Sequence, residues 1–388
     1  MNQNIEEKWV AVWGNAMSIA DRRPAYYAKN VTLRYPVMPL LDGSAVRITL
    51  DNFTGTEDVI ISKVFVAPTD KENCEQTCAL GIAAVTFSGK PWVVIPAGTS
   101  VVSDPVSFSI KRGRYFSVSM YLGEFTLMRS GVRITGPLSK AFFSVGDYGE
   151  APVLPWEVTK EHHWFYFLSE VDVLTESGNR AVICYGDSIT AQSWPDYVSK
   201  LLLDRGNTQT AIIRRAASGT RILRQYENIT YDSYGLQGSK RIPRELNAAG
   251  ADTIIIQQGI NDIIHPVGTE VNRFRPWSDL PTAEELIRGL QMYIRQAKAH
   301  GLKVYLGTLL PIEGWRTYAD FREDLRNRVN EWMRITEEAD GCIDFDRAVC
   351  DENHPSAFRE GFDSGDHLHP SKAAYRQMAE CAWSKIME

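Results

Sequence analysis

Apolar residues from the N-terminus to about residue 177 fall in short runs, and in many of these runs every second position is apolar. Examples are VTLRYPV (31–37), DVIISKVFVA (58–67) and YFSVSMYL (115–122), with turn residues such as LDGS, FSGKP and PAGTS elsewhere between runs. Runs of this length predict β-strands joined by tight turns. No long helical pattern precedes residue 190, so residues 1–177 are predicted to form an all-β sandwich of the jelly-roll type.

From about residue 178 onward, apolar runs alternate with amphipathic segments. The apolar runs predict five strands, at 181–185, 210–214, 253–258, 303–309 and 342–345. Between two of them, residues 281–301 have apolar side chains at helical spacing, Thr282 and Glu285 in a capping-box pattern, and Gly301 as a stop signal. Strands that alternate with helices predict a parallel sheet, so residues 178–388 are expected to form an α/β domain.

The two predicted domains meet at the polar segment TESGN (175–179). The apolar segment WFYFLSEVDVL (164–174) leads almost directly into the first strand of the α/β domain, which leaves little room for a flexible tether. We therefore expect the two domains to pack rigidly, with the N-terminal one forming part of the wall above the strand ends of the other.

Composition and charge narrow the classes of function. The 388 residues are 44% hydrophobic and carry a net charge of −6, which is ordinary for a globular protein. The densest basic cluster, SKRIPREL (239–246), is interpreted as a solvated helix start, so nucleic acid is not an expected partner. No apolar run approaches the roughly 18 residues of a membrane helix, so no membrane association is expected.

The N-terminus and the cysteines favour a cytoplasmic location. The first residues carry charges where an export signal would need an apolar stretch. The six cysteines have no zinc-ribbon or CxxC spacing, and reduced structural thiols fit them best. The pattern contains no signal that specifies an oligomeric state.

Candidate chemistry begins where the first α/β strand ends, in AVICYGDSITAQSW (181–194). In an open parallel sheet, ligands bind beyond the carboxyl ends of the strands, and the N-terminus of the following helix favours negative charge there. Ser188 lies at this position. It has three alternative interpretations: a nucleophile, part of a phosphate-binding turn, or a plain helix cap. The glycine-rich loops that a phosphate site needs, GxGxxG or GxxxxGK[ST], are absent.

A serine nucleophile needs a base and donors for the oxyanion. His369 follows Asp366 by three residues in DSGDHLHPSK, a spacing at which the carboxylate can orient the imidazole; a solvated loop is the alternative, and His367 is a weaker candidate. Gly219 follows the second strand and Asn261 follows the third, where they can supply donors.

These residues together resemble the SGNH (GDSL-type) hydrolase superfamily of esterases and lipases. GDSIT, Gly219, GIND and DHLHP match its four sequence blocks in order over roughly residues 180–388. The resemblance implies a flavodoxin-like three-layer α/β/α domain with neither a metal nor an organic cofactor. It also implies Ser188 as nucleophile, His369 as general base and acid, Asp366 as orienting carboxylate, and Ser188, Gly219 and Asn261 as the oxyanion hole.

The upstream runs resemble the β-sandwich domain that precedes the hydrolase domain in a two-domain branch of this superfamily. One block departs from the pattern, because Arg214, Ala216 and Ala217 stand where many relatives have asparagine, glycine and isoleucine. The resemblance therefore implies the Gly219 donor but does not define the path of the loop around it.

Aromatic residues in the loops after the α/β strands bear on the substrate. Tyr226, Tyr234, Trp277 and Trp315 are candidates for sugar contacts, although such rings also pack loops against a domain. The preferred prediction is a serine esterase that removes acetyl groups from O-acetylated carbohydrate, whether a small molecule or an oligosaccharide. A general short-chain carboxylesterase or lipase-like enzyme, an acyltransferase, and a carbohydrate-binding protein with an inactive hydrolase domain remain alternatives.

Overall fold

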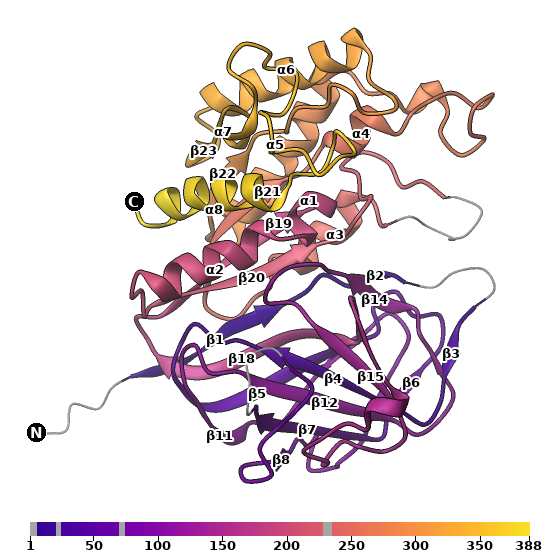
Figure 1. Cartoon of the computed structure of the whole chain (residues 1–388), viewed down its shortest axis with the longest axis vertical. Helices are drawn as coiled ribbons and strands as arrows, with labels where there is room; N and C mark the ends of the chain where they lie inside the picture. Colours follow the sequence, from indigo (N-terminus) through magenta and orange to yellow (C-terminus); the bar gives the residue numbers. More distant parts are fainter. Residues whose placement is uncertain (1–5, 21–24, 70–73, 228–234) are drawn as a thin grey trace, which may run out of the picture.

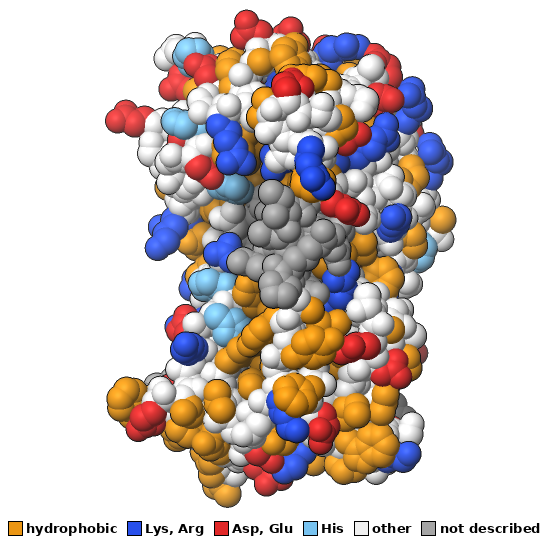
Figure 2. Space-filling model, turned by 90° about the vertical axis from the view of Figure 1, so that its right-hand side faces the viewer, with side chains coloured by type: hydrophobic (Ala, Val, Ile, Leu, Met, Phe, Trp, Pro, Cys, Tyr) orange, Lys and Arg blue, Asp and Glu red, His pale blue; other side chains and the backbone are white. Residues whose placement is uncertain are grey.

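The computed structural model describes residues 6–20, 25–69, 74–227 and 235–388. The chain forms one elongated body in which a strand-rich N-terminal half is stacked against a C-terminal half of strands and helices (Figures 1 and 2). None of the helices in the described ranges combines the length and apolarity needed to cross a bilayer.

The N-terminal half consists of antiparallel sheets, as its sequence pattern predicts. One sheet has the order β1-β18-β5-β10, with β11 also paired to β5, and its strands are β1 (Glu7–Gly14), β18 (Leu168–Glu176), β5 (Gly43–Asp51), β10 (Ser100–Val102) and β11 (Val106–Ile110). The other has the order β16-β15-β4-β12-β7-β8, with β16 (Thr159–His162), β15 (Ala141–Val145), β4 (Val31–Val37), β12 (Phe116–Leu122), β7 (Lys63–Pro68) and β8 (Ala83–Ala84).

Three small sheets and one short 3-10 helix complete this half. The sheets are β17-β14-β2, with β17 (Trp164–Tyr166), β14 (Ser130–Arg133) and β2 (Ser18–Ile19); β13 (Thr126–Leu127) with β3 (Tyr27–Ala28); and β6 (Val59–Ile61) with β9 (Val93–Ile95). The 3-10 helix is η1 (Trp156–Val158). Alternate residues of the strands form the core: Val46, Ile48 and Leu50 of β5 are buried, as are Leu33 and Tyr35 of β4.

The C-terminal half is built on a parallel sheet with the order β20-β19-β21-β22-β23. Its strands are β19 (Arg180–Gly186), β20 (Thr210–Ala216), β21 (Ala251–Gln257), β22 (Lys303–Gly307) and β23 (Gly341–Ile343), so all five predicted strands are confirmed. Helices cover both faces, as the predicted α/β/α architecture requires, and β19 is therefore buried along almost its whole length.

The helices are α1 (Ser188–Ala191), α2 (Trp194–Asp204), α3 (Gly238–Glu245), α4 (Ile260–Ile264), α5 (Ala283–Ala299), α6 (Asp320–Ile335), α7 (Phe345–Val349) and α8 (Lys372–Ile386), with the 3-10 helix η2 (Trp277–Asp279). Helix α2 packs against α8, and α5 packs against α6. The predicted capping box at the start of α5 is present. The Thr282 hydroxyl accepts a hydrogen bond from the backbone N–H of Glu285, and the Glu285 carboxylate accepts one from the backbone N–H of Thr282.

Strand order fixes where a ligand can bind. The chain builds β19 first, places β20 on one side of it, and then crosses to place β21 on the other side. The connections after β19 and β21 therefore run to opposite faces of the sheet, which opens a crevice at their carboxyl ends. Ser188 follows β19, and Asn261 follows β21.

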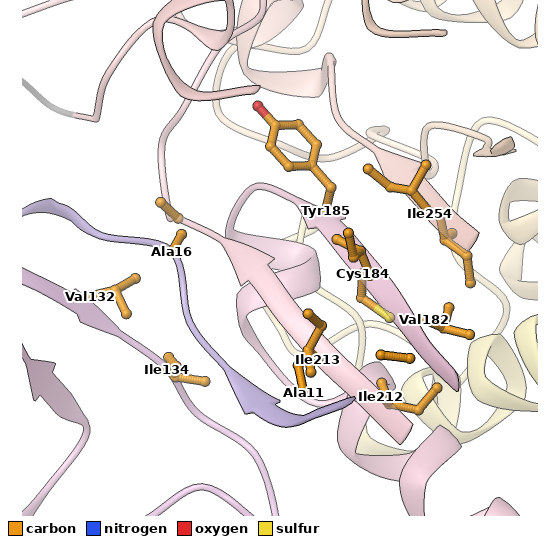
Figure 3. Packing of buried hydrophobic residues seen from close by; sticks show 14 of the residues in the cluster. Ala11, Ala16, Val132, Ile134, Val182, Cys184, Tyr185, Ile212, Ile213 and Ile254 are labelled. Carbon is orange, nitrogen blue, oxygen red and sulfur yellow. The ribbon is translucent and has the colours of Figure 1, made fainter. Parts of the chain in front are cut away.

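The join between the halves is both apolar and ionic. Strand β1 lies beside β20, and Figure 3 shows Ala11 of β1 and Ile213 of β20 in the same apolar cluster. The Ala11 backbone N–H also donates to the carbonyl of Ala249, at 2.8 Å. The turn at 177–179, between β18 and β19, joins the two halves along the chain.

The prediction that SKRIPREL is a solvated helix start is right about the helix but wrong about the solvation of Arg241 and Glu245. The segment forms most of α3, in which Arg241 and Glu245 are buried. Arg241 donates to the Thr220 hydroxyl at 2.9 Å and to the Arg215 carbonyl at 3.1 Å. Arg244 reaches across the join to form an ion pair with Asp51. The charges are thus partnered inside the protein, which a run of charged letters cannot reveal.

Candidate active site

Ser188 lies at the abrupt change from β19 to α1. Gly186 ends the strand so close to the Gln257 carbonyl and the Thr190 hydroxyl that a Cβ there would clash with both. Asp187 then caps α1, with its carboxylate accepting from the Ile189 backbone N–H at 3.0 Å. The half-buried Ser188 side chain is thereby placed at the carboxyl edge of the sheet.

Three residues that the sequence singled out form one hydrogen-bonded chain. Ser188 Oγ lies 2.9 Å from His369 Nε2, and His369 Nδ1 lies 2.6 Å from Asp366 Oδ2. His367 takes no part, because its backbone has a φ of +61° and its ring pairs with Asp363 instead, at 2.8 Å. The connected serine, imidazole and carboxylate have the geometry that nucleophilic catalysis requires.

Asp366 is held as a carboxylate. Partial burial acts to raise the pKa of Asp366, but hydrogen bonds from the His369 ring and from the backbone N–H groups of His369 and Leu368 outweigh it, and the pKa lies well below its ordinary value. Its Oδ1 accepts those backbone bonds at 2.8 and 3.0 Å, which leaves Oδ2 for the imidazole. The carboxylate can therefore fix the ring orientation and stabilise an imidazolium.

Gly219 and Asn261 are the two residues for which the sequence predicts donors to an oxyanion. Gly219 has a φ of +75°, which explains a glycine in this turn. Asn261 lies in the first turn of α4 and donates one amide hydrogen to the Thr220 carbonyl at 3.2 Å. An asparagine amide has two hydrogens, so the second is left for a ligand. Both residues line the same cavity as Ser188.

The cavity over Ser188 has a volume of about 750 Å³ and is shared between the two halves. The N-terminal half contributes one wall, made of Ser18, Ile19, Gly131, Val132, Arg133 and Trp164. No motif marks these residues in the sequence, and the short join at residues 175–179 was the one signal that this half would lie near the site. Among the described residues, no group of three or more His, Cys, Asp or Glu side chains could hold a metal ion.

Of the four aromatic residues predicted to contact substrate, Trp315 lines the cavity. Tyr226 does not: it is buried and packs edge-on against His265, with ring centroids 4.9 Å apart. Trp277 is also outside the lining, because its half-exposed ring packs against Phe321, at 6.4 Å. Tyr234 lies outside the described residues. Loop aromatics thus served mainly to pack the loops.

Arg214, which departs from the pattern of relatives, ties the base of the site to the N-terminal half. Its buried guanidinium donates to the Thr190 and Gln192 carbonyls, at 3.2 and 3.0 Å, and forms an ion pair with Asp196. It also donates to the Ser139 hydroxyl at 3.1 Å. The arginine therefore holds the turn after α1 in place, and it also binds a residue of the N-terminal half.

The burial of Asp187 leads us to expect that the protein becomes less stable as the pH rises. Burial, reinforced by the charge of Asp262 and opposed by the Ile189 N–H and His369, raises the pKa of Asp187 to about 7. The folded protein then keeps a proton that the unfolded chain loses, so the contribution to stability is present at low pH and is lost as pH rises toward 7. Between pH 5 and pH 7 the free energy of unfolding should fall by about 2–3 kcal/mol from this group.

Urea denaturation of wild-type protein and of Asp187→Asn at both pH values measures this effect. The asparagine can still accept from Ile189 but does not titrate, so its profile should be flatter by that amount. Equal slopes for the two proteins would show that Asp187 is ionised throughout.

Comparison with known proteins finds one matching family and several solved structures of similar fold. The model of the GDSL-like lipase/acylhydrolase family matches residues 184–377, which include Ser188, Gly219, Asn261, Asp366 and His369. No curated protein matches the chain. A GDSL-like lipase from Bacteroides thetaiotaomicron is 17% identical, with 54% of this chain and 88% of that chain covered and a TM-score of 0.38. A variant of an acetyl xylan esterase from Geobacillus stearothermophilus is 17% identical, with 54% and 95% covered and a TM-score of 0.39.

Proposed function

This chain belongs to the GDSL-like lipase/acylhydrolase family and is a carboxylic ester hydrolase, and from this premise we propose that it removes acetyl groups from O-acetylated carbohydrate through a Ser188–His369–Asp366 triad. The observation that carries the proposal is the chain of two hydrogen bonds, 2.9 and 2.6 Å long, that joins these residues beneath the shared cavity. The same cavity is lined by Gly219 and Asn261.

In the first half-reaction, Ser188 Oγ attacks the ester carbonyl carbon while His369 Nε2 takes the hydroxyl proton. The carbonyl oxygen becomes an oxyanion, which the backbone N–H groups of Ser188 and Gly219 and the free amide hydrogen of Asn261 stabilise. When the carbon–oxygen bond to the sugar breaks, His369 returns the proton to the departing alkoxide. Ser188 is left as an acetyl ester.

The second half-reaction repeats these steps with water. His369 takes a proton from water as the water oxygen attacks the acetyl carbonyl, and it then returns the proton to Ser188 Oγ. Acetate leaves, and the serine is regenerated. Asp366 stays ionised throughout, because its hydrogen bonds hold its pKa well below the ordinary value.

The walls of the cavity support a short acyl group on a polar alcohol. Beside the triad, the lining includes Gln192, Ser218 and His265, together with the rings of Trp164 and Trp315. A long acyl chain needs a continuous aliphatic groove, whereas flat rings among polar groups suit the apolar face of a sugar.

A chain-length series tests the proposal. Turnover of p-nitrophenyl esters should be fastest for acetate and should fall steadily from butyrate to octanoate, and acetate should be released from acetylated oligosaccharides. The measurement is kcat/KM for each ester, with Ser188→Ala as the blank. A maximum at octanoate or beyond would contradict the assignment to short acyl groups.

A further inference from the structure

Two arginine–tryptophan pairs, one from each half of the protein, line the cavity above Ser188. In the N-terminal half, Arg133 of β14 lies directly opposite Trp164 of β17 in an antiparallel pairing. Directly opposed residues place their side chains on the same face of a sheet. In the C-terminal half, the Arg316 guanidinium lies 4.6 Å from the centroid of the Trp315 ring, in the loop after β22. The cavity thus combines an aromatic surface and a cation on both sides.

Neither guanidinium group has a carboxylate partner in the part of the chain that the structure describes. Within the described residues, neither Arg133 nor Arg316 forms an ion pair, and both are exposed. The one carboxylate that the described residues place in the cavity wall is Asp366, which is bound to His369. Several buried arginines elsewhere in the chain are paired with carboxylates, as Arg214 is with Asp196 and Arg326 with Asp346.

The cavity is therefore locally positive in a chain of net charge −6. The neighbouring His265 agrees with this charge: burial, followed by the charges of arginines that include Arg275 and Arg316, holds the pKa of His265 well below its ordinary value. An anionic group on a substrate would find complementary charge here.

We infer that the cavity selects acylated carbohydrates that carry a carboxylate, that is, esters of uronic-acid sugars. This inference rests on the proposed function and specifies its substrate class. Trp164 and Trp315 offer faces for the sugar ring, and the planar guanidinium groups of Arg133 and Arg316 match a carboxylate with two parallel hydrogen bonds. Because Arg133 comes from the strand-rich half, that half acts as a specificity element of the esterase site.

Binding of a ligand that cannot be turned over tests the inference without relying on catalysis. Trigalacturonic acid and its methyl ester differ in carboxylate charge but carry no acetyl group. Calorimetry should show wild-type protein binding the acid at least about fivefold more tightly than the methyl ester, and the difference should shrink as salt is raised. Arg133→Gln and Arg316→Gln should each reduce the preference for the acid.

Arg114→Gln and Arg288→Gln are matched controls, because both arginines are exposed, lie outside the cavity lining and come from the two different halves. They should keep the wild-type preference. Equal binding of acid and methyl ester by wild-type protein, or an unchanged preference in both Arg133→Gln and Arg316→Gln, would overturn the inference.

Acetate release from O-acetylated oligogalacturonide then links binding to catalysis. Wild-type protein should release acetate with a higher kcat/KM from the free acid than from its methyl ester, and Arg133→Gln should lower that ratio about fivefold. Acid-selective binding without acetate release would refute the proposed esterase on this substrate but keep the anion site. Acetate release at equal rates from both would keep the esterase and refute the anion site.

Discussion

Replacing Ser188 with alanine should lower kcat toward acetyl esters by about four or more orders of magnitude while leaving the fold intact. In the proposed mechanism the serine supplies the atom that forms the acyl-enzyme, and its hydroxyl lies 2.9 Å from His369 Nε2. Members of a triad act as one unit, so loss of the nucleophile removes the benefit of the other two as well. The side chain is half-buried and caps no helix, so the free energy of unfolding should change by less than about 1 kcal/mol.

Two further variants place the result within the proposed mechanism. His369→Ala should lower kcat about as much as Ser188→Ala does. The double variant, with both changes, should have a kcat little lower than that of either single variant. Asp366→Asn should be milder, because the backbone bonds at Oδ1 still hold the loop. Ser218→Ala, which removes another hydroxyl from the same cavity wall, should alter kcat by no more than a few-fold. Near-normal turnover by Ser188→Ala would refute the mechanism.

The parts of the site that sequence could predict are those that follow from strand ends. A parallel sheet brings the residues after its strands to one edge, so Ser188, Gly219 and Asn261 could be expected together without knowledge of any contact. The Asp366 and His369 pair is also local, since three residues separate them. In each case a short segment of backbone fixes the relation between the groups.

The wall contributed by the N-terminal half could not be predicted residue by residue. Arg133 and Trp164 are adjacent because β14 and β17 pair, and they line the cavity over Ser188 because the halves are stacked. No period or motif encodes a pairing across 31 residues followed by a docking of two domains. Tyr226 does not line the cavity for the related reason that a loop ring has two uses, and here the ring packs edge-on against His265.

Replacing Arg215 of β20 with methionine should lower the free energy of unfolding of the whole protein by about 3–5 kcal/mol. Arg215 is buried at the join, where its guanidinium donates to the Asn15 and Ser169 carbonyls, each at 2.6 Å, and pairs with Glu170. The Glu245 carboxylate lies 3.6 Å away on the other side. Methionine fills similar volume but would leave the Glu170 carboxylate and two carbonyls without the Arg215 guanidinium, and Glu245 with Arg241 as its remaining partner. Removing one partner in this way is the costly way to break a buried pair.

The loss of stability should depend on how deeply the ion pair is buried, and an ion pair at the surface provides the comparison. Arg180 and Asp252 also form an ion pair, at 3.3 Å, but their side chains are 29% and 49% exposed, so Arg180→Met should cost at most about 1 kcal/mol. Adding Glu170→Gln to Arg215→Met should restore part of the lost stability, since a neutral amide no longer leaves a buried charge unpaired.

Chemical denaturation followed by tryptophan fluorescence and by circular dichroism measures the stability of all three variants. Because Arg215 belongs to β20 while Asn15, Ser169 and Glu170 belong to the strand-rich half, its removal weakens the contact between halves and not one half alone. Wild-type protein should therefore unfold in one transition, and Arg215→Met should unfold at lower denaturant with the two probes beginning to separate. A variant as stable as wild type would mean that the buried charges do not hold the halves together, and the cavity wall that carries Arg133 would then depend on the apolar contacts of β1 with β20.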